Sequence, residues 1–193
     1  SPSAEGLAEL GKKSNLLRGR DFPASVRRIQ RHKILVAGSF IMGLGVDEPG
    51  IGKRIAAAAN YYGVDNLIAL FLTPLPGTRL WDQMKSDDRI ALDEFPADWR
   101  YYTLAFPVAR YKHLSAGELI EEMAACSREF YSLRRIFRRV FRSVWHWRRP
   151  LISLVANLSH RRNMWLEAEA HAEFLRDRGH SAPSPSMAGS SPP

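Results

Sequence analysis

The residues from Gly38 to Arg54, GSFIMGLGVDEPGIGKR, place glycines and a lysine at spacings that could cradle a phosphate group. The dinucleotide fingerprint G-x-G-x-x-G fails because Glu48 stands at its third glycine. The P-loop pattern G-x-x-x-x-G-K-[ST] fails because Asp47 replaces its first glycine and Arg54 replaces its hydroxyl residue. Nucleotide-phosphate chemistry is therefore disfavoured here, and the glycines need another explanation.

Other side chains that commonly carry chemistry do not form a recognised site. The six histidines are scattered singly, with neither an HExxH motif nor a closely spaced histidine pair for a metal ion. Ser39 lacks the G-x-S-x-G sequence of a nucleophile elbow. The single cysteine, Cys126, excludes an internal disulfide and a metal cage made only of cysteines. These residues predict neither nucleophilic catalysis nor a metal site.

Two apolar runs, residues 33–43 and 66–74, are predicted to be the strands that position the glycine segment. Their length and composition favour strands buried on both faces, as in a parallel sheet. Helices are predicted around them over residues 4–13, 22–32, 49–63 and 75–85, with Gly63 as a C-terminal stop and Thr78 as an N-cap. This alternation predicts an α/β layer or barrel with parallel crossovers. Ligands of such folds bind at the carboxyl ends of the strands.

The later part of the chain has a different character. From about residue 95 an aromatic, proline-broken connection leads into predicted helices over residues 115–147 and 150–178. The end of the chain is rich in proline and serine, which is typical of disorder. We therefore expect three segments: residues 1–94, a helical extension over 95–179, and a disordered tail over 180–193.

A cluster of arginines is the most prominent feature of the composition. The chain carries a formal charge of +8, and eight arginines lie between Arg128 and Arg149 with Glu129 as the only acid among them. Such a helix could contact nucleic-acid phosphates. The favoured alternative is an amphipathic helix whose charged face is solvated, so nucleic acid is a disfavoured partner. The residues of its expected core-facing stripe are Phe130, Leu133, Phe137, Val140, Phe141 and Val144.

The bulk composition fits an ordinary globular domain. The 193 residues are 45% hydrophobic and 25% charged, which allows a sizeable core. No apolar run approaches the roughly 20 residues that a membrane span requires, and the first residues do not resemble a signal peptide. A cytoplasmic location is the expectation.

Three motifs occur in a fixed order in residues 1–15, 27–50 and 70–84. Their matching positions are Ser1, Pro2, Ser3, Lys12 and Asn15 in the first, Ile34, Val36, Gly38, Phe40, Ile41, Gly43 and Asp47 in the second, and Thr73, Pro74, Pro76, Gly77 and Thr78 in the third. In this order they resemble the later half of a radical S-adenosylmethionine protein of the cobalamin-binding type. The resemblance extends over residues 1 to 179 and includes the helical extension.

The resemblance implies the C-terminal part of a (β/α)6 partial TIM-like barrel, followed by a mostly α-helical extension. Full-length members bind S-adenosylmethionine and a [4Fe–4S] iron–sulfur cluster, and cobalamin is a further cofactor of this type. The family cleaves S-adenosylmethionine to a 5′-deoxyadenosyl radical, which takes hydrogen from a substrate. Carried over by position, the residues expected along the adenosine part of that cofactor are Phe40, Ile41, Gly43, Thr73, Pro74 and Leu75.

Two departures from the family pattern limit what this chain is expected to do. The family holds its cluster with a C-x3-C-x2-C loop, whereas this chain has only Cys126. Gly45 stands where the family usually has aspartate. We therefore expect a fragment of a radical S-adenosylmethionine enzyme, inactive alone and with no catalytic or metal-ligating residue of its own. It is either a truncated gene product or one half of a split enzyme whose N-terminal half-barrel lies on a separate chain, and a decayed protein without activity is a third possibility. The alternative is a non-enzymatic basic helical module that binds nucleic acid or an acidic partner.

Overall fold

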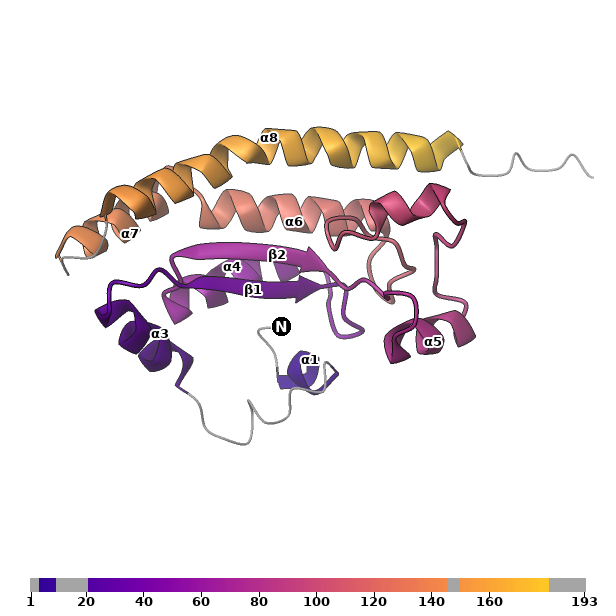
Figure 1. Ribbon diagram of the computed structural model, residues 1–193, viewed down its shortest axis with the longest axis horizontal. Helices are drawn as coiled ribbons and strands as arrows, with labels where there is room; N and C mark the ends of the chain where they lie inside the picture. The colour runs from indigo at the N-terminus through magenta and orange to yellow at the C-terminus, as the bar shows by residue number, and fades with distance from the viewer. Residues whose placement is uncertain (1–3, 10–20, 146–149, 181–193) are drawn as a thin grey trace, which may run out of the picture.

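The computed structural model describes residues 4–9, 21–145 and 150–180 (Figure 1). Its elements are α1 (Ala4–Glu9), α3 (Phe22–Arg31), β1 (Ala37–Met42), α4 (Ile51–Tyr62), β2 (Asn66–Phe71), α5 (Arg79–Ser86), the 3-10 helix η1 (Ala97–Tyr101), α6 (Ala116–Phe130), α7 (Leu133–Trp145) and α8 (Pro150–His180). The motif positions Ser1, Pro2, Ser3, Lys12 and Asn15, and the tail from residue 181, lie outside the described residues. None of the described helices is both long and apolar enough to cross a membrane.

The sheet has two parallel strands joined through α4. The register runs from Ala37 opposite Asn66 to Met42 opposite Phe71. The predicted α/β class is confirmed in this coarse form, with helices dominating a small parallel sheet. Thr78 caps α5, where its side chain accepts a hydrogen bond from the Trp81 amide, and Gly63 ends α4, both as the sequence predicts.

In the middle of the sheet, the described helices cover one face only. Phe40, Met42, Leu67 and Phe71 belong to the main core, which also takes in residues of α4 and α6. The alternate side chains point to the other face, and there Ser39 is exposed and Ile68 is 39% exposed. The prediction that both strands are buried on both faces is wrong at Ser39 and Ile68, because no described layer covers the second face of the sheet there.

The glycines at the start of α4 allow a close approach between α4 and α6. The carboxylate of Glu122, on α6, accepts hydrogen bonds from the amides of Gly50 at 2.6 Å and Gly52 at 2.7 Å. A Cβ added at Gly52 would overlap the backbone carbonyl oxygen of Glu122. The amides that a phosphate loop would offer to an anion are thus capped by a side chain of the same protein.

The helix predicted over residues 115–147 is two helices, with the break at Tyr131 and Ser132. The Tyr131 hydroxyl accepts a hydrogen bond from the Leu67 amide at 3.0 Å and donates one to the Leu67 carbonyl at 2.9 Å. In a parallel strand both groups point to the same side, so the hydroxyl occupies the edge of β2 that faces away from β1. Further along that edge, the Phe71 amide donates to the Leu104 carbonyl at 2.9 Å.

The opposite edge of the sheet belongs to β1. The carbonyls of Val36 and Met42 accept hydrogen bonds from the amides of Asn66 and Leu72. The intervening backbone groups, at Ala37, Ser39 and Ile41, therefore point away from β2. Within the described ranges, no strand other than β2 pairs with β1, so the outer edge of β1 has no strand beside it.

The break between α6 and α7 also changes which residues of the arginine-rich helix are buried. Phe130 and Ile136 are buried and Val140 is half-buried. The predicted core-facing stripe is wrong at four of its six positions, because the second helix starts in a new orientation after Ser132. The exposed members are Leu133, Phe137, Phe141 and Val144.

The core continues across the boundary expected at residues 94 and 95. Phe174 of α8 and Leu119 of α6 belong to the same cluster of buried residues as Phe40 and Ile55. Helices α6 and α8 therefore share one core with the sheet and α4. The division of the chain into segments at residues 94 and 95 stays a prediction.

Candidate cofactor wall at the strand carboxyl ends

The two loops expected to carry function lie side by side. Both strands of the parallel sheet point toward α5, so their carboxyl ends meet at one end of the molecule (Figure 1). The Leu72 amide donates to the Met42 carbonyl at 2.7 Å and continues the pairing to the first residue of the second loop. This is the end of a parallel sheet at which ligands ordinarily bind.

Asp47 holds the first loop in shape. Its side chain is buried and one carboxylate oxygen accepts hydrogen bonds from the amides of Gly43 at 2.9 Å and Leu44 at 3.0 Å. Charge-assisted bonds of this kind are stronger than neutral ones and offset the cost of burying the carboxylate. The aspartate of the sequence motif thus has a positioning role that spacing alone did not reveal.

Tyr111 covers the ends of both strands. Gly43 has a φ of +93°, and a Cβ placed on it would lie 2.5 Å from the Tyr111 ring. The Tyr111 hydroxyl donates to the Leu72 carbonyl at 3.0 Å, and burial raises the pKa of this phenol. Glycine at position 43 therefore leaves room for the tyrosine ring in this structure. Sequence reasoning missed Tyr111 because it lies in an aromatic connection without a motif.

Phe40 and Ile41, both expected at the end of the first strand, point to opposite faces of the sheet. Phe40 is buried in the main core and points away from the second face of the sheet. Ile41, on the other face, is half-buried against a small cluster that includes Leu44, Leu72 and Met84. Only backbone atoms of Phe40 could therefore contact a ligand on the second face.

The three expected residues of the second loop form a short rigid segment. The Thr73 hydroxyl is buried and donates to the Phe71 carbonyl at 3.1 Å. Pro74 is fully buried, whereas Leu75 is exposed. The structure gathers all six expected residues at one end of the sheet without directing their side chains into one described cavity. Their contact with a cofactor stays a prediction.

The chain does not fit an iron–sulfur cluster by itself. Cys126, its one cysteine, is fully buried in the core, and burial raises the pKa of its thiol to about 12. A cluster needs several thiolate ligands. Within the described residues, no group of three or more histidine, cysteine or acidic side chains is placed to hold a metal ion.

We predict that Cys126 resists alkylation in the native chain. The shift of its pKa from 9.0 to about 12 lowers the thiolate fraction near neutral pH by about a thousandfold, and burial blocks access as well. Mass spectrometry after iodoacetamide treatment should find native Cys126 unmodified, and the same chain in urea fully alkylated. Equal labelling rates in the two states would contradict the buried position.

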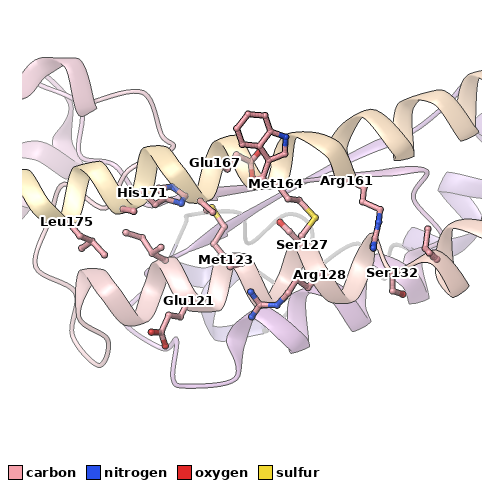
Figure 2. Close-up of a pocket in the computed structure, with 16 residues that line it drawn as sticks. Glu121, Met123, Ser127, Arg128, Ser132, Arg161, Met164, Glu167, His171 and Leu175 are labelled. Carbon is pink, nitrogen blue, oxygen red and sulfur yellow. The ribbon is translucent and has the colours of Figure 1, made fainter.

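A separate groove lies between α6 and α8. It has a volume of about 880 Å³ and an apolar interior to which Ile120, Met123, Met164 and Leu175 contribute. Figure 2 shows the labelled side chains of the two helices on either side of it, with Glu121 and Arg128 on α6 and Arg161 and Glu167 on α8. None of the six residues expected at the cofactor lines this groove.

One known protein gives a distant match to the chain. The chain is 28% identical over 137 residues to bacteriochlorophyllide d C-12(1)-methyltransferase of Chlorobaculum tepidum. The match covers 69% of this chain and 28% of that protein. No protein-family model matches the chain, and no solved structure gives a significant match. The similarity suggests a distant origin within the radical S-adenosylmethionine superfamily, which the sequence motifs also resemble.

Proposed function

We propose that this chain is the C-terminal part of a radical S-adenosylmethionine enzyme, and that β1 and β2 are two neighbouring strands of its barrel. The observation that carries the proposal is the difference between the two edges of the sheet. Tyr131 and Leu104 occupy the edge of β2. The edge of β1 has no strand neighbour in the described ranges. Further strands can therefore join the sheet on one side only.

The exposed face of the sheet supports the same arrangement. An uncovered strand edge beside exposed apolar residues is a liability that proteins normally avoid. Ile68 is exposed on that face, and Ser39 lies beside it in the register. Strands that pair with β1 and curve over this face would enclose it, as happens inside a barrel. β1 and β2 would then be the last two strands of an open barrel, closed off by the helical extension.

In this proposal the wall residues lie along S-adenosylmethionine in the completed barrel. They are Phe40, Ile41, Gly43, Thr73, Pro74 and Leu75. The thiolates of the [4Fe–4S] cluster, and any cobalamin site, come from residues outside this chain. The name of the similar protein makes methyl transfer the first reaction class to test. Cofactors carry such chemistry, and this chain would position them and exclude water.

The first experiment concerns the DNA upstream of the Ser1 codon. We expect a reading frame there, continuous with this chain or on a neighbouring gene, that encodes a C-x3-C-x2-C loop and the missing strands. The complete product, purified without oxygen and supplied with iron and sulfide, is expected to bind iron and S-adenosylmethionine. Iron analysis and calorimetric titration measure both. A complete product that binds neither would contradict the proposal.

A variant of β1 tests the edge itself. Ser39→Pro removes an amide that points away from β2, so it blocks addition of a new strand while the pairing of β1 with β2 is kept. Ser39→Ala is the matched control. When the missing strands are co-expressed as a separate polypeptide, we expect Ser39→Ala to copurify with them and Ser39→Pro to lose them. Equal recovery by both variants would show that β1 is not the joining edge.

A further inference from the structure

Helix α7 has three faces of different character. Ile136, Arg139 and Val140 lie on the packed side, where they are buried or half-buried. A second face is apolar and exposed, and Phe137 on it is 74% exposed. The exposed apolar residues at this helical spacing are Leu133, Phe137, Phe141 and Val144. Four such side chains in one row form a continuous apolar stripe open to solvent.

The third face of α7 is cationic. Arg134 and Arg138 are exposed and lie next to the apolar stripe, and Arg142 continues their four-residue spacing. Two further arginines of the helix are engaged within the protein. Arg135 pairs with Glu129, and Arg139 is bonded to Asn157. Among the described side chains of α7, the exposed guanidinium groups of Arg134 and Arg138 therefore lie beside the apolar stripe.

The first turns of α8 also carry exposed apolar side chains. Leu151, Ile152, Val155 and Leu158 are exposed. Four residues separate the end of α7 from the start of α8, so these side chains lie at the same end of the helical hairpin. Figure 1 shows this end on the side of the molecule opposite to the carboxyl ends of the strands. A partner bound to this end of the hairpin would therefore not cover the loops at the carboxyl ends of β1 and β2.

We propose that the α7–α8 end of the molecule binds the surface of a bilayer that contains anionic lipids. A helix with an exposed apolar stripe flanked by arginines can bury that stripe at the level of the lipid headgroups, while the arginines contact the headgroup phosphates. This mode requires a helix that lies on the membrane.

Two other occupants fit the surface less well. A nucleic acid would use the arginines, but it would leave the aliphatic side chains of Leu133 and Val144 without a base to stack on. A second copy of the chain would cover the apolar stripe, but a copy with a net charge of +8 offers the arginines little negative charge. A lipid surface uses the apolar and the charged faces at once.

The test is cosedimentation of the full chain with vesicles. Vesicles of phosphatidylcholine alone are compared with vesicles in which one third of the lipid is phosphatidylglycerol, at low and high salt. We expect binding to the anionic vesicles that weakens with salt. Arg134→Gln with Arg138→Gln should weaken it by about fivefold for each arginine removed. Phe137→Ala with Phe141→Ala should weaken it at least tenfold.

Matched variants elsewhere on the surface act as controls. Arg27→Gln with Arg28→Gln removes the same charge from the exposed side of α3, and Tyr61→Ala removes an aromatic ring that is 75% exposed on α4. Both should bind anionic vesicles as the unaltered chain does. Circular dichroism confirms that each variant is folded.

Three results would overturn the proposal. The first is absence of vesicle binding, or binding that the control variants weaken equally. The second is binding to DNA or RNA that exceeds vesicle binding and is unchanged by Phe137→Ala with Phe141→Ala. The third is self-association in analytical ultracentrifugation that the same double variant abolishes, without any effect on vesicles.

Discussion

Replacing Gly52 with alanine is expected to lower the free energy of unfolding by about 3 kcal/mol. The added Cβ would overlap the backbone carbonyl of Glu122, which cannot rotate away as a side chain could. Helices α4 and α6 would have to separate, and the hydrogen bonds from Gly50 and Gly52 to the Glu122 carboxylate would be lost with them. Urea unfolding followed by tryptophan fluorescence measures the change.

Gly117→Ala is the matched control for Gly52→Ala. Gly117 lies in the first turn of α6, and a Cβ there would meet no atom within 4 Å. Alanine favours the helix over glycine, so this variant should be unchanged or more stable by up to about 1 kcal/mol. Equal stability of the two variants would show that α4 and α6 do not pack as closely as described.

The second large effect is expected for Asn157→Leu, which should destabilise the protein by about 3 kcal/mol. Asn157 is fully buried on α8, and its amide donates to the carbonyls of Ser153 and Asp65. Its oxygen accepts from the Arg139 guanidinium at 2.6 Å. Burial lowers the pKa of Arg139 to about 10, because desolvation disfavours the charged guanidinium. Leucine cannot accept a hydrogen bond, so the buried Arg139 guanidinium would lose one of its acceptors.

A double variant distinguishes loss of the hydrogen bond between Arg139 and Asn157 from a change in side-chain packing alone. Arg139→Met removes the charge that Asn157→Leu would strand, so the double variant should be more stable than the sum of the two single effects predicts. Arg138→Met, at the exposed neighbouring position, should change the free energy of unfolding by less than about 0.5 kcal/mol. Strict additivity of Arg139→Met and Asn157→Leu would contradict the coupling.

The parts of the fold that depend on local pattern were predictable from the sequence. The helices, the two strands and the caps at Thr78 and Gly63 follow from periodicity and from the chemistry of helix ends. The break at Tyr131 was not predictable in this way, because neither glycine nor proline marks it. Tyr131 is fixed instead by its bonds to Leu67, 64 residues away along the chain.

The candidate site shows the same limit. Motif spacing selected Gly43 and Asp47, and the structure places both in the loop after β1. The contact of Gly43 with the Tyr111 ring could not be read from spacing, since Tyr111 approaches from a connection that carries no motif. Glu122 similarly caps the start of α4 from 70 residues further along. Side-chain contacts between segments so far apart leave no period in the sequence.

The hydroxyl of Tyr131 also determines how copies of this chain can associate. Growth of a fibre through strand pairing needs two free edges on every chain, one to receive a neighbour and one to offer to the next. Because Tyr131 and Leu104 occupy the edge of β2, the edge of β1 is the one that the described part of the chain leaves for another strand. Pairing between copies through the sheet would therefore stop at two, and Tyr131 together with Leu104 would prevent open-ended aggregation by strand pairing.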